Sequence, residues 1–148
     1  MKNVVIIGGG TGGTVTANSL VRRLDSKEYQ ITVIDYSARH YYQPGFVSLT
    51  MGKVPNPLLW RWRRRTFLPG IRFLQDKVIA VDPVAKTVTT QTKRISYDYL
   101  ILATGCECRP ELVEGMAKGT VLNTGIYSFY PLAWARRLRR ALQTFDHG

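Results

Sequence analysis

The stretch Val4-Val5-Ile6-Ile7-Gly8-Gly9-Gly10-Thr11-Gly12-Gly13 decides the fold of this chain of 148 residues. Its four β-branched apolar residues run directly into glycines, which predicts a buried parallel strand that ends in a turn. A helical pattern follows from Thr14 to Leu24. Ile31-Thr32-Val33-Ile34 then predicts a second strand, with Asp35 at its carboxyl end. The order is therefore strand, glycine turn, helix, strand and acid.

Gly8, Gly10 and Gly13 have the spacing and the strand-to-helix context of a dinucleotide-binding fingerprint. The first glycine permits the tight turn, the second lets the backbone approach a pyrophosphate, and the third lets the helix pack closely. The helix N-terminus presents unpaired N–H groups and a positive dipole end to the phosphates. Asp35 follows at close to the spacing of about 20 residues expected for the acid that binds a ribose hydroxyl. The alternative for Asp35 is a turn residue or a helix cap.

The composition is that of a globular protein, with 45% hydrophobic and 21% charged residues. No apolar stretch approaches the roughly 20 residues that a membrane span needs, and no signal peptide precedes the first strand. The two cysteines are too few for a disulfide framework. We therefore expect a cytoplasmic protein.

The net charge of +11 comes largely from two clusters of arginines. Such clusters suit phosphates, nucleic acid or acidic lipid headgroups, or they form a solvated face. No dedicated nucleic-acid motif accompanies them, so nucleic acid is not the expected partner. The clusters comprise Arg61, Arg63, Arg64, Arg65, Arg136, Arg137, Arg139 and Arg140.

The segment from Tyr36 to Gly45 is predicted to be a loop beyond the second strand, where ligands bind in open α/β sheets. Its tyrosines and Gln43 either contact a planar ring or only pack the loop. His40 is interpreted as a surface or hydrogen-bonded histidine, because no second ligand lies at a metal-binding spacing. No metal site is expected.

The stretch Leu58–Leu68 is predicted to be a helix with mixed apolar and basic faces, ended by Pro69-Gly70. Trp beside Arg is typical of a segment at a membrane surface, and equally of a helix packed on a sheet with solvated arginines. We favour the packed helix. A last amphipathic helix is predicted from Ser128 to Phe145.

Short strands are predicted between these helices, and an Asp82-Pro83 turn with alternating residues beyond it indicates an antiparallel β-meander. The last of them precedes Thr104 and Gly105 and, if parallel to the first strand, ends beside the glycine turn. The fold class is therefore α/β, Rossmann-like, with a central parallel sheet and an inserted meander. The predicted strands are Ile71–Leu74, Lys77–Val81, Lys86–Thr90 and Tyr99–Ala103.

These motifs together resemble the FAD-binding half of the pyridine nucleotide-disulfide oxidoreductase superfamily, in which a strand ending in Ala-Thr-Gly follows a meander. Within it, Gly9–Gly13 and His40-Tyr41-Tyr42-Gln43-Pro44-Gly45-Phe46 look most similar to sulfide:quinone oxidoreductases. The resemblance covers essentially the whole chain. It implies that the parent enzyme oxidises sulfide and passes the electrons through FAD to membrane quinone.

The resemblance also implies the site. The glycine turn would bind the FAD pyrophosphate, Asp35 the adenosine ribose, and Val78 the adenine through its backbone, while Thr104 and Gly105 complete the pocket. The predicted cofactor-binding residues are Gly8, Gly9, Gly10, Thr11, Gly12, Gly13, Asp35, Tyr36, Gln43, Pro44, Val78, Thr104 and Gly105.

The chain departs from the family in two ways. The family continues into a second dinucleotide-type domain and a C-terminal membrane segment, so residues 1–148 are expected to be a fragment with the FAD-binding domain alone. Where the family carries its first redox-active cysteine, this sequence has Thr124-Gly125-Ile126. Cys106 and Cys108 follow the Ala-Thr-Gly motif instead, either as redox-active thiols or as ordinary loop residues.

Three functions remain open at this point. The first is the FAD-binding portion of a sulfide:quinone oxidoreductase, which would contact a membrane surface peripherally. The second is a type-II NADH:quinone reductase, whose FAD half has the same motifs. The third is a non-catalytic dinucleotide-binding module, which would bind an adenine dinucleotide or pair with itself to cover its sheet edges.

Overall fold

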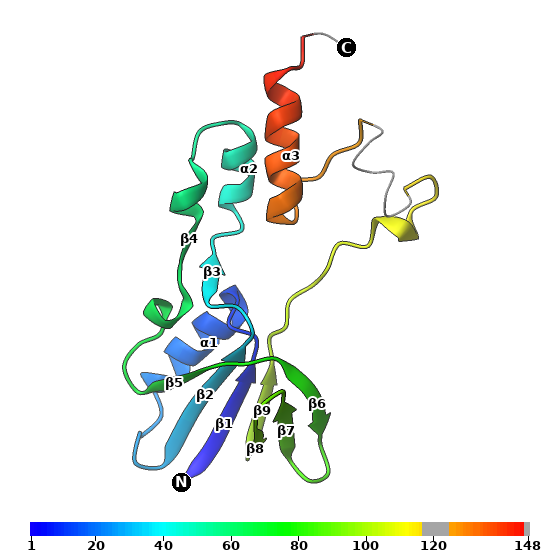
Figure 1. The fold of residues 1–148 in the computed structure, drawn as a ribbon. Helices are drawn as coiled ribbons and strands as arrows, with labels where there is room; N and C mark the ends of the chain where they lie inside the picture. The colour runs from blue at the N-terminus through cyan, green and yellow to red at the C-terminus, as the bar shows by residue number, and fades with distance from the viewer. Residues whose placement is uncertain (117–124, 147–148) are drawn as a thin grey trace. The chain divides into compact units, whose positions relative to one another are not determined.

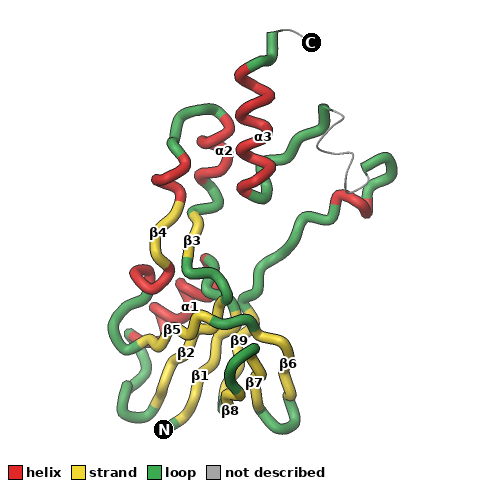
Figure 2. The backbone as a smooth tube through the Cα atoms, in the orientation of Figure 1, coloured by secondary structure: helices red, strands yellow, loops and turns green. Residues whose placement is uncertain are grey.

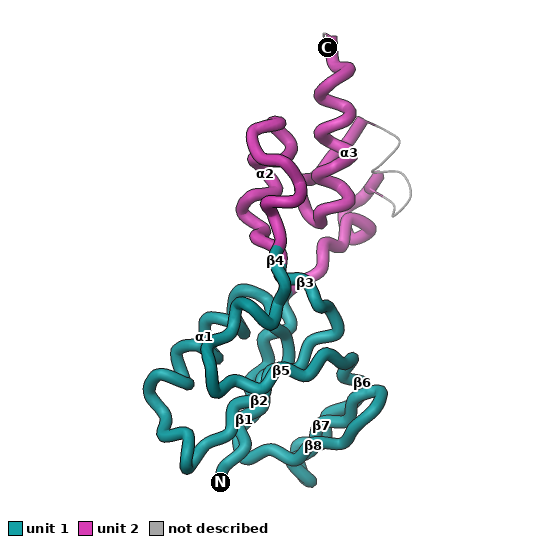
Figure 3. The backbone as a smooth tube through the Cα atoms, turned by 60° about the vertical axis from the view of Figure 1, so that its left-hand side comes forward, with its two compact units in different colours: residues 1–40, 61–105 teal, residues 41–60, 106–148 magenta. Residues whose placement is uncertain are grey.

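The computed structural model describes residues 1–116 and 125–146 of the chain (Figure 1). The chain divides into two compact units, coloured separately in Figure 3. Unit 1 comprises residues 1–40 and 61–105, and unit 2 comprises residues 41–60 and 106–148.

Unit 1 is built on a four-stranded sheet in the order β5-β2-β1-β9. Every neighbouring pair is parallel, with Val4 of β1 opposite Ile31 of β2 and Tyr99 of β9. The predicted parallel sheet is therefore confirmed, and the last strand, β9, pairs parallel with the first. The carboxyl ends of all the strands meet at one edge. The strands are β1 (Lys2–Ile7), β2 (Tyr29–Asp35), β5 (Ile71–Gln75) and β9 (Tyr99–Leu102).

The two faces of this sheet carry different elements, because successive side chains of a strand point to opposite sides. Val4 and Ile6 face Ala17 of helix α1 (Thr11–Val21) in one core cluster. Val5 and Ile7 pack with Val88 in the other. Both faces of β1 are thus buried, which explains why the sequence of this strand from Val4 to Ile7 is continuously apolar.

Val88 belongs to a three-stranded antiparallel meander in the order β6-β7-β8. The strands are β6 (Val78–Asp82), β7 (Thr87–Thr90) and β8 (Arg94–Ser96). The meander confirms the prediction, but β8 was not among the predicted strands. It has three residues, too few for an alternating pattern to identify.

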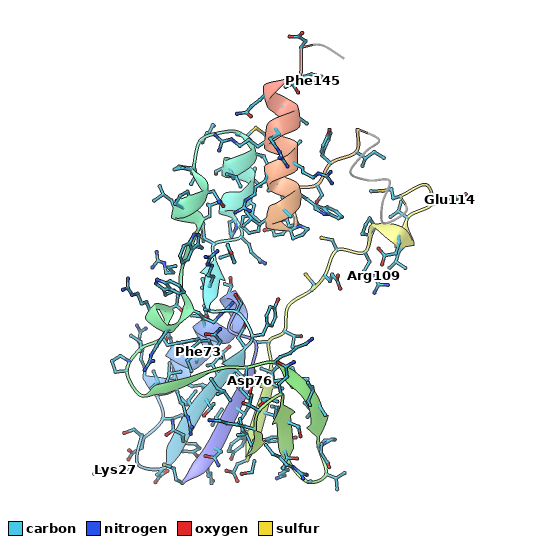
Figure 4. All side chains as sticks on the ribbon, in the orientation of Figure 1. Lys27, Phe73, Asp76, Arg109, Glu114 and Phe145 are labelled. Atoms are coloured by element: carbon cyan, nitrogen blue, oxygen red, sulfur yellow. The ribbon has the colours of Figure 1, made fainter. Side chains whose placement is uncertain are left out.

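Asp76 ties this meander to the parallel sheet and is labelled in Figure 4 where the chain passes from β5 to β6. Its carboxylate accepts hydrogen bonds from the hydroxyl of Thr92 at 2.5 Å, the hydroxyl of Thr90 at 2.7 Å and the backbone N–H of Lys77 at 2.7 Å. These bonds, from Thr92 first and then Thr90, lower the pKa of Asp76 to about 2.

The helix predicted over Leu58–Leu68 is wrong, as the tube in Figure 2 makes visible. A 3₁₀ helix (Asn56–Leu59) is followed by strand β4 (Trp60–Trp62) and a second 3₁₀ helix (Arg63–Thr66). The side chains of Leu59 and Arg63 are both buried, but in different units. Leu59 packs in the core of unit 2 and Arg63 is buried in unit 1, so the tertiary contacts of each unit prevail over the local helical pattern.

Two further boundaries differ from the predictions. The Tyr36–Gly45 loop contains strand β3 (Arg39–Tyr41), which forms a two-stranded sheet with β4. Helix α1 begins at Thr11 rather than Thr14, because the N–H of Thr14 already bonds the carbonyl of Gly10.

Unit 2 contains helix α2 (Gly45–Thr50) and helix α3 (Leu132–Gln143), the latter shorter than the predicted span 128–145. Phe46 and Leu49 of α2 pack against Leu59 and against Ala135 of α3. Within the described ranges, no helix has both the length and the apolar character needed to cross a membrane.

The D76N variant should unfold more easily than the native chain at neutral pH. The folded-state pKa of Asp76, about 2, lies below the value of about 3.9 for an unfolded aspartate. Its stabilising contribution is therefore present above about pH 4 and lost as the pH falls towards 2. Urea unfolding midpoints should differ at pH 7 and converge in acid. D146N, at an exposed position, is the control, and equal midpoints for native chain and D76N at pH 7 would refute this role.

Candidate functional site

The glycine turn lies at the carboxyl edge of the parallel sheet, between β1 and α1. The N–H of Gly8 donates to the carbonyl of Ile34 at 2.8 Å, and that of Ala103 donates to Ile7 at 2.8 Å. Gly8 has φ +99°, and a Cβ there would overlap the carbonyl oxygen of Ala103. Only glycine fits this position, as the fingerprint predicts.

The start of α1 faces open space. A Cβ on Gly10 or Gly12 would meet nothing within 4 Å, whereas one on Gly13 would overlap the carbonyl oxygen of Gly8. The first turn of a helix carries N–H groups without helical acceptors. An anion can therefore reach these donors without displacing a side chain, and the residues present fit a diphosphate.

Asp35 ends β2 beside this turn, with its side chain 12% exposed. One carboxylate oxygen accepts the N–H of Gly9 at 2.7 Å, and the other accepts the N–H of Ser37 at 2.8 Å. Asp35 is thus fixed against the glycine turn by hydrogen bonds from both sides. Each oxygen has further lone pairs with which to accept a hydroxyl.

Arg63 is the functional residue that the sequence reasoning missed. Its side chain is 7% exposed, and its guanidinium donates to the carbonyls of Gly9, of Ser37 at 2.8 Å and of Arg39 at 2.7 Å. It also lies 3.3 Å from the Asp35 carboxylate. Burial lowers the pKa of Arg63 and the charge of Asp35 opposes this shift. An arginine nevertheless stays protonated in proteins.

This arrangement corrects the prediction of solvated arginines between Arg61 and Arg65. Arg61, Arg64 and Arg65 are exposed as expected, but Arg63 is a buried cation. Local sequence gives no signal that separates it from its neighbours. The carbonyl groups that bind it come from residues far away in the chain.

Two more side chains converge on the carbonyl oxygen of Gly9. The hydroxyl of Thr14 donates to it at 3.1 Å, and Nδ1 of His40 lies 3.2 Å from it. His40, in β3, is therefore a histidine within hydrogen-bond distance of the glycine turn, which agrees with its interpretation as a surface or hydrogen-bonded histidine. Among residues 1–116 and 125–146, no three or more His, Cys, Asp or Glu residues cluster as metal ligands.

The other predicted site residues of unit 1 are only partly brought together. A Cβ on Gly8 would lie 3.1 Å from Cα of Thr104, so the end of β9 borders the turn. Gly105 follows with φ +78°. Tyr36 directly follows Asp35 and is 75% exposed, while Val78 is half-buried against the meander core.

Gln43, Pro44, Cys106 and Cys108 belong to unit 2, and all four are exposed. Both cysteines are free thiols. Thr124 belongs to the Thr124-Gly125-Ile126 segment, which stands where the resemblance expects a redox-active cysteine. It lies outside the described residues.

Comparison with known proteins identifies a family and several similar oxidoreductases. Residues 2–142 match the sequence profile of the family described as pyridine nucleotide-disulphide oxidoreductase. The chain is 30% identical over 146 residues to the mitochondrial sulfide:quinone oxidoreductase of Mus musculus, covering 98% of this chain and 32% of that protein. It is 28% identical over 137 residues to the type II NADH:quinone oxidoreductase of Haemophilus influenzae, covering 82% of this chain and 30% of that protein.

A solved structure is similar to this chain in both sequence and fold. The X-ray structure of the sulfide:quinone oxidoreductase from Aquifex aeolicus matches with a TM-score of 0.77 and 33% identity, covering 97% of this chain and 32% of that one. The chain thus spans about a third of the length of the relatives that it matches.

G13A should lower the free energy of unfolding by about 1–3 kcal/mol, because the new methyl group overlaps backbone that cannot move aside. G12A is the matched control, since its methyl group enters open space within the same helix. That change should be neutral or stabilise by up to about 1 kcal/mol through helix propensity. Chemical denaturation measures both, and equal effects would contradict the packing described for Gly13.

Proposed function

The chain belongs to the pyridine nucleotide-disulphide oxidoreductase family, and on this basis we propose that it is the FAD-binding N-terminal portion of a flavoprotein oxidoreductase, most closely of the sulfide:quinone type. The observation that carries the proposal is the preformed glycine turn at the carboxyl edge of the sheet. Gly9 bonds Asp35 there, and open space lies before α1.

FAD fits the residues that gather at this edge. The N-terminus of α1 would hold the diphosphate, because its first N–H groups face open space. Asp35 would accept a hydroxyl of the adenosine ribose with the lone pairs that Gly9 and Ser37 leave free. Thr104 and Gly105 would border the cofactor from the end of β9.

When bound, a flavin supplies the two-electron chemistry, and the protein supplies binding and orientation. The names of the relatives supply the rest of the proposal: sulfide as electron donor and quinone as acceptor. A quinone dissolved in a membrane would bring the protein to the membrane surface, and the arginines of α3 suit anionic headgroups there. These are Arg136, Arg137, Arg139 and Arg140.

A second candidate is a type-II NADH:quinone oxidoreductase, which the similarity to the Haemophilus influenzae protein supports. A third, of another class, is a non-catalytic dinucleotide-binding module, in which Cys106 and Cys108 have no redox part. The donor distinguishes the first two, and any electron transfer distinguishes both from the third.

The 148-residue chain should take up FAD but not FMN. FMN carries a single phosphate and lacks the adenosine monophosphate part of FAD, so it has neither the diphosphate for the glycine turn nor the adenosine ribose for Asp35. Absorption spectra after removal of free cofactor, followed by denaturation to release what is bound, measure both. Failure to retain FAD, or equal retention of FMN, would contradict the proposed site.

Sulfide added to the FAD-loaded chain under exclusion of oxygen should bleach the flavin absorption. Bleaching by NADH instead would favour the second candidate. Stable FAD binding with no bleaching by either donor would favour the non-catalytic module.

A further inference from the structure

The carbonyl oxygen of Gly9 is held by an unusual number of side chains. The guanidinium of Arg63 donates to it, as does the hydroxyl of Thr14 at 3.1 Å, and Nδ1 of His40 lies 3.2 Å away. These three residues come from the second 3₁₀ helix, from α1 and from β3. Such convergence on one carbonyl fixes the plane of the peptide between Gly9 and Gly10.

The direction of that peptide has a consequence for ligand binding. In a trans peptide, the C=O of one residue and the N–H of the next point in opposite directions. With the Gly9 oxygen turned towards Arg63, the Gly10 N–H is turned away from it. A Cβ on Gly10 would meet nothing within 4 Å, so the space beside the Cα of Gly10 is open to a ligand.

The peptide before Gly9 is fixed as well. The N–H of Gly9 donates to Asp35 at 2.7 Å, and the same carboxylate lies 3.3 Å from Arg63. The Asp35 carboxylate thus binds the N–H of Gly9, while the Arg63 guanidinium binds its carbonyl oxygen. A Cβ at Gly9 would lie 2.8 Å from Cδ of Arg63, so a side chain there would displace the arginine from its position behind the turn.

We propose that Arg63 is a positioning residue for the diphosphate of a bound dinucleotide, acting through the carbonyl of Gly9 to direct the Gly10 N–H at the phosphate oxygens. This inference rests on the proposed function. Arg63 itself stays behind the turn, where it is 7% exposed. Because its charge is paired with Asp35 at 3.3 Å, Arg63 acts on the phosphates through the orientation of the Gly9–Gly10 peptide rather than as a free cation.

Arginine suits this position better than lysine. The planar guanidinium donates through Nε to Ser37, through Nη2 to Arg39 and through Nη1 to Gly9. An ammonium group is a compact point charge and cannot reproduce this fork. R63K therefore keeps the charge and loses the fixed geometry.

The test is calorimetric titration of the 148-residue chain with adenosine diphosphate, with the urea midpoint of each variant measured alongside. R63Q and R63K should bind ADP at least about tenfold more weakly, because each loses a charge-assisted bond or its geometry. R64Q alters the exposed neighbour in the same 3₁₀ helix and should bind within about twofold of the native chain.

A second pair of variants covers the case in which changes at Arg63 prevent folding. T14A removes a neutral donor to the same carbonyl and should weaken ADP binding about threefold. T16A, two residues on in α1, should leave binding unchanged. A purely structural role for Arg63 would lower the urea midpoint without separating T14A from T16A in ADP affinity.

The outcomes separate this inference from the function on which it rests. If the native chain does not bind ADP, the proposed function and the role of Arg63 both fall. If it binds ADP, and T14A and the foldable Arg63 variants bind as tightly as T16A and R64Q, the role of Arg63 alone is overturned. Weakened binding in T14A and R63K with intact folding supports it.

Discussion

The pairing of Asp35 with Arg63 around Gly9 is the constraint on which the candidate site depends. The Asp35 carboxylate accepts a hydrogen bond from the N–H of Gly9, and the Arg63 guanidinium donates one to the carbonyl oxygen of Gly9. The two charged groups are 3.3 Å apart. Burying such a pair costs desolvation that its attraction offsets only in part, so stability alone is a weak reason for it. What the pair provides is a backbone held in one conformation before any ligand arrives. Removing one partner would leave the other as an uncompensated charge in a buried place.

The parallel sheet makes this pairing possible. Because β1, β2 and β9 run in the same direction, the glycine turn, Asp35 and Thr104 all lie at one edge. The two faces of the sheet are covered by α1 and by the meander, and Asp76 anchors the meander at the end of β5. The site is therefore supported by regular elements rather than by a free loop.

The sequence predicted the parts of this site that local patterns encode. Continuous β-branched residues identified β1 and β2, and the spacing of Gly8, Gly10 and Gly13 identified the turn between β1 and α1. The sequence could not identify Arg63, because its burial depends on carbonyl groups of Gly9, Ser37 and Arg39, which lie far away in the chain. The same cause explains the wrong helix over residues 58–68: tertiary contacts with Leu59 and Arg63 prevail over a local pattern that favours a helix. Strand β8 escaped prediction because three residues are too few to show a period.

The central claim is that the glycine turn is preformed and that a dinucleotide binds to it without rearranging what lies behind. The most direct measurement is an NMR titration of the isotopically labelled chain with FAD, following backbone amides and the Nε–H of Arg63. We expect the largest shifts at Gly10 to Gly13, with the Arg63 resonance retained and still protected from exchange with water. Shifts confined to other residues, or loss of the Arg63 protection on binding, would contradict it.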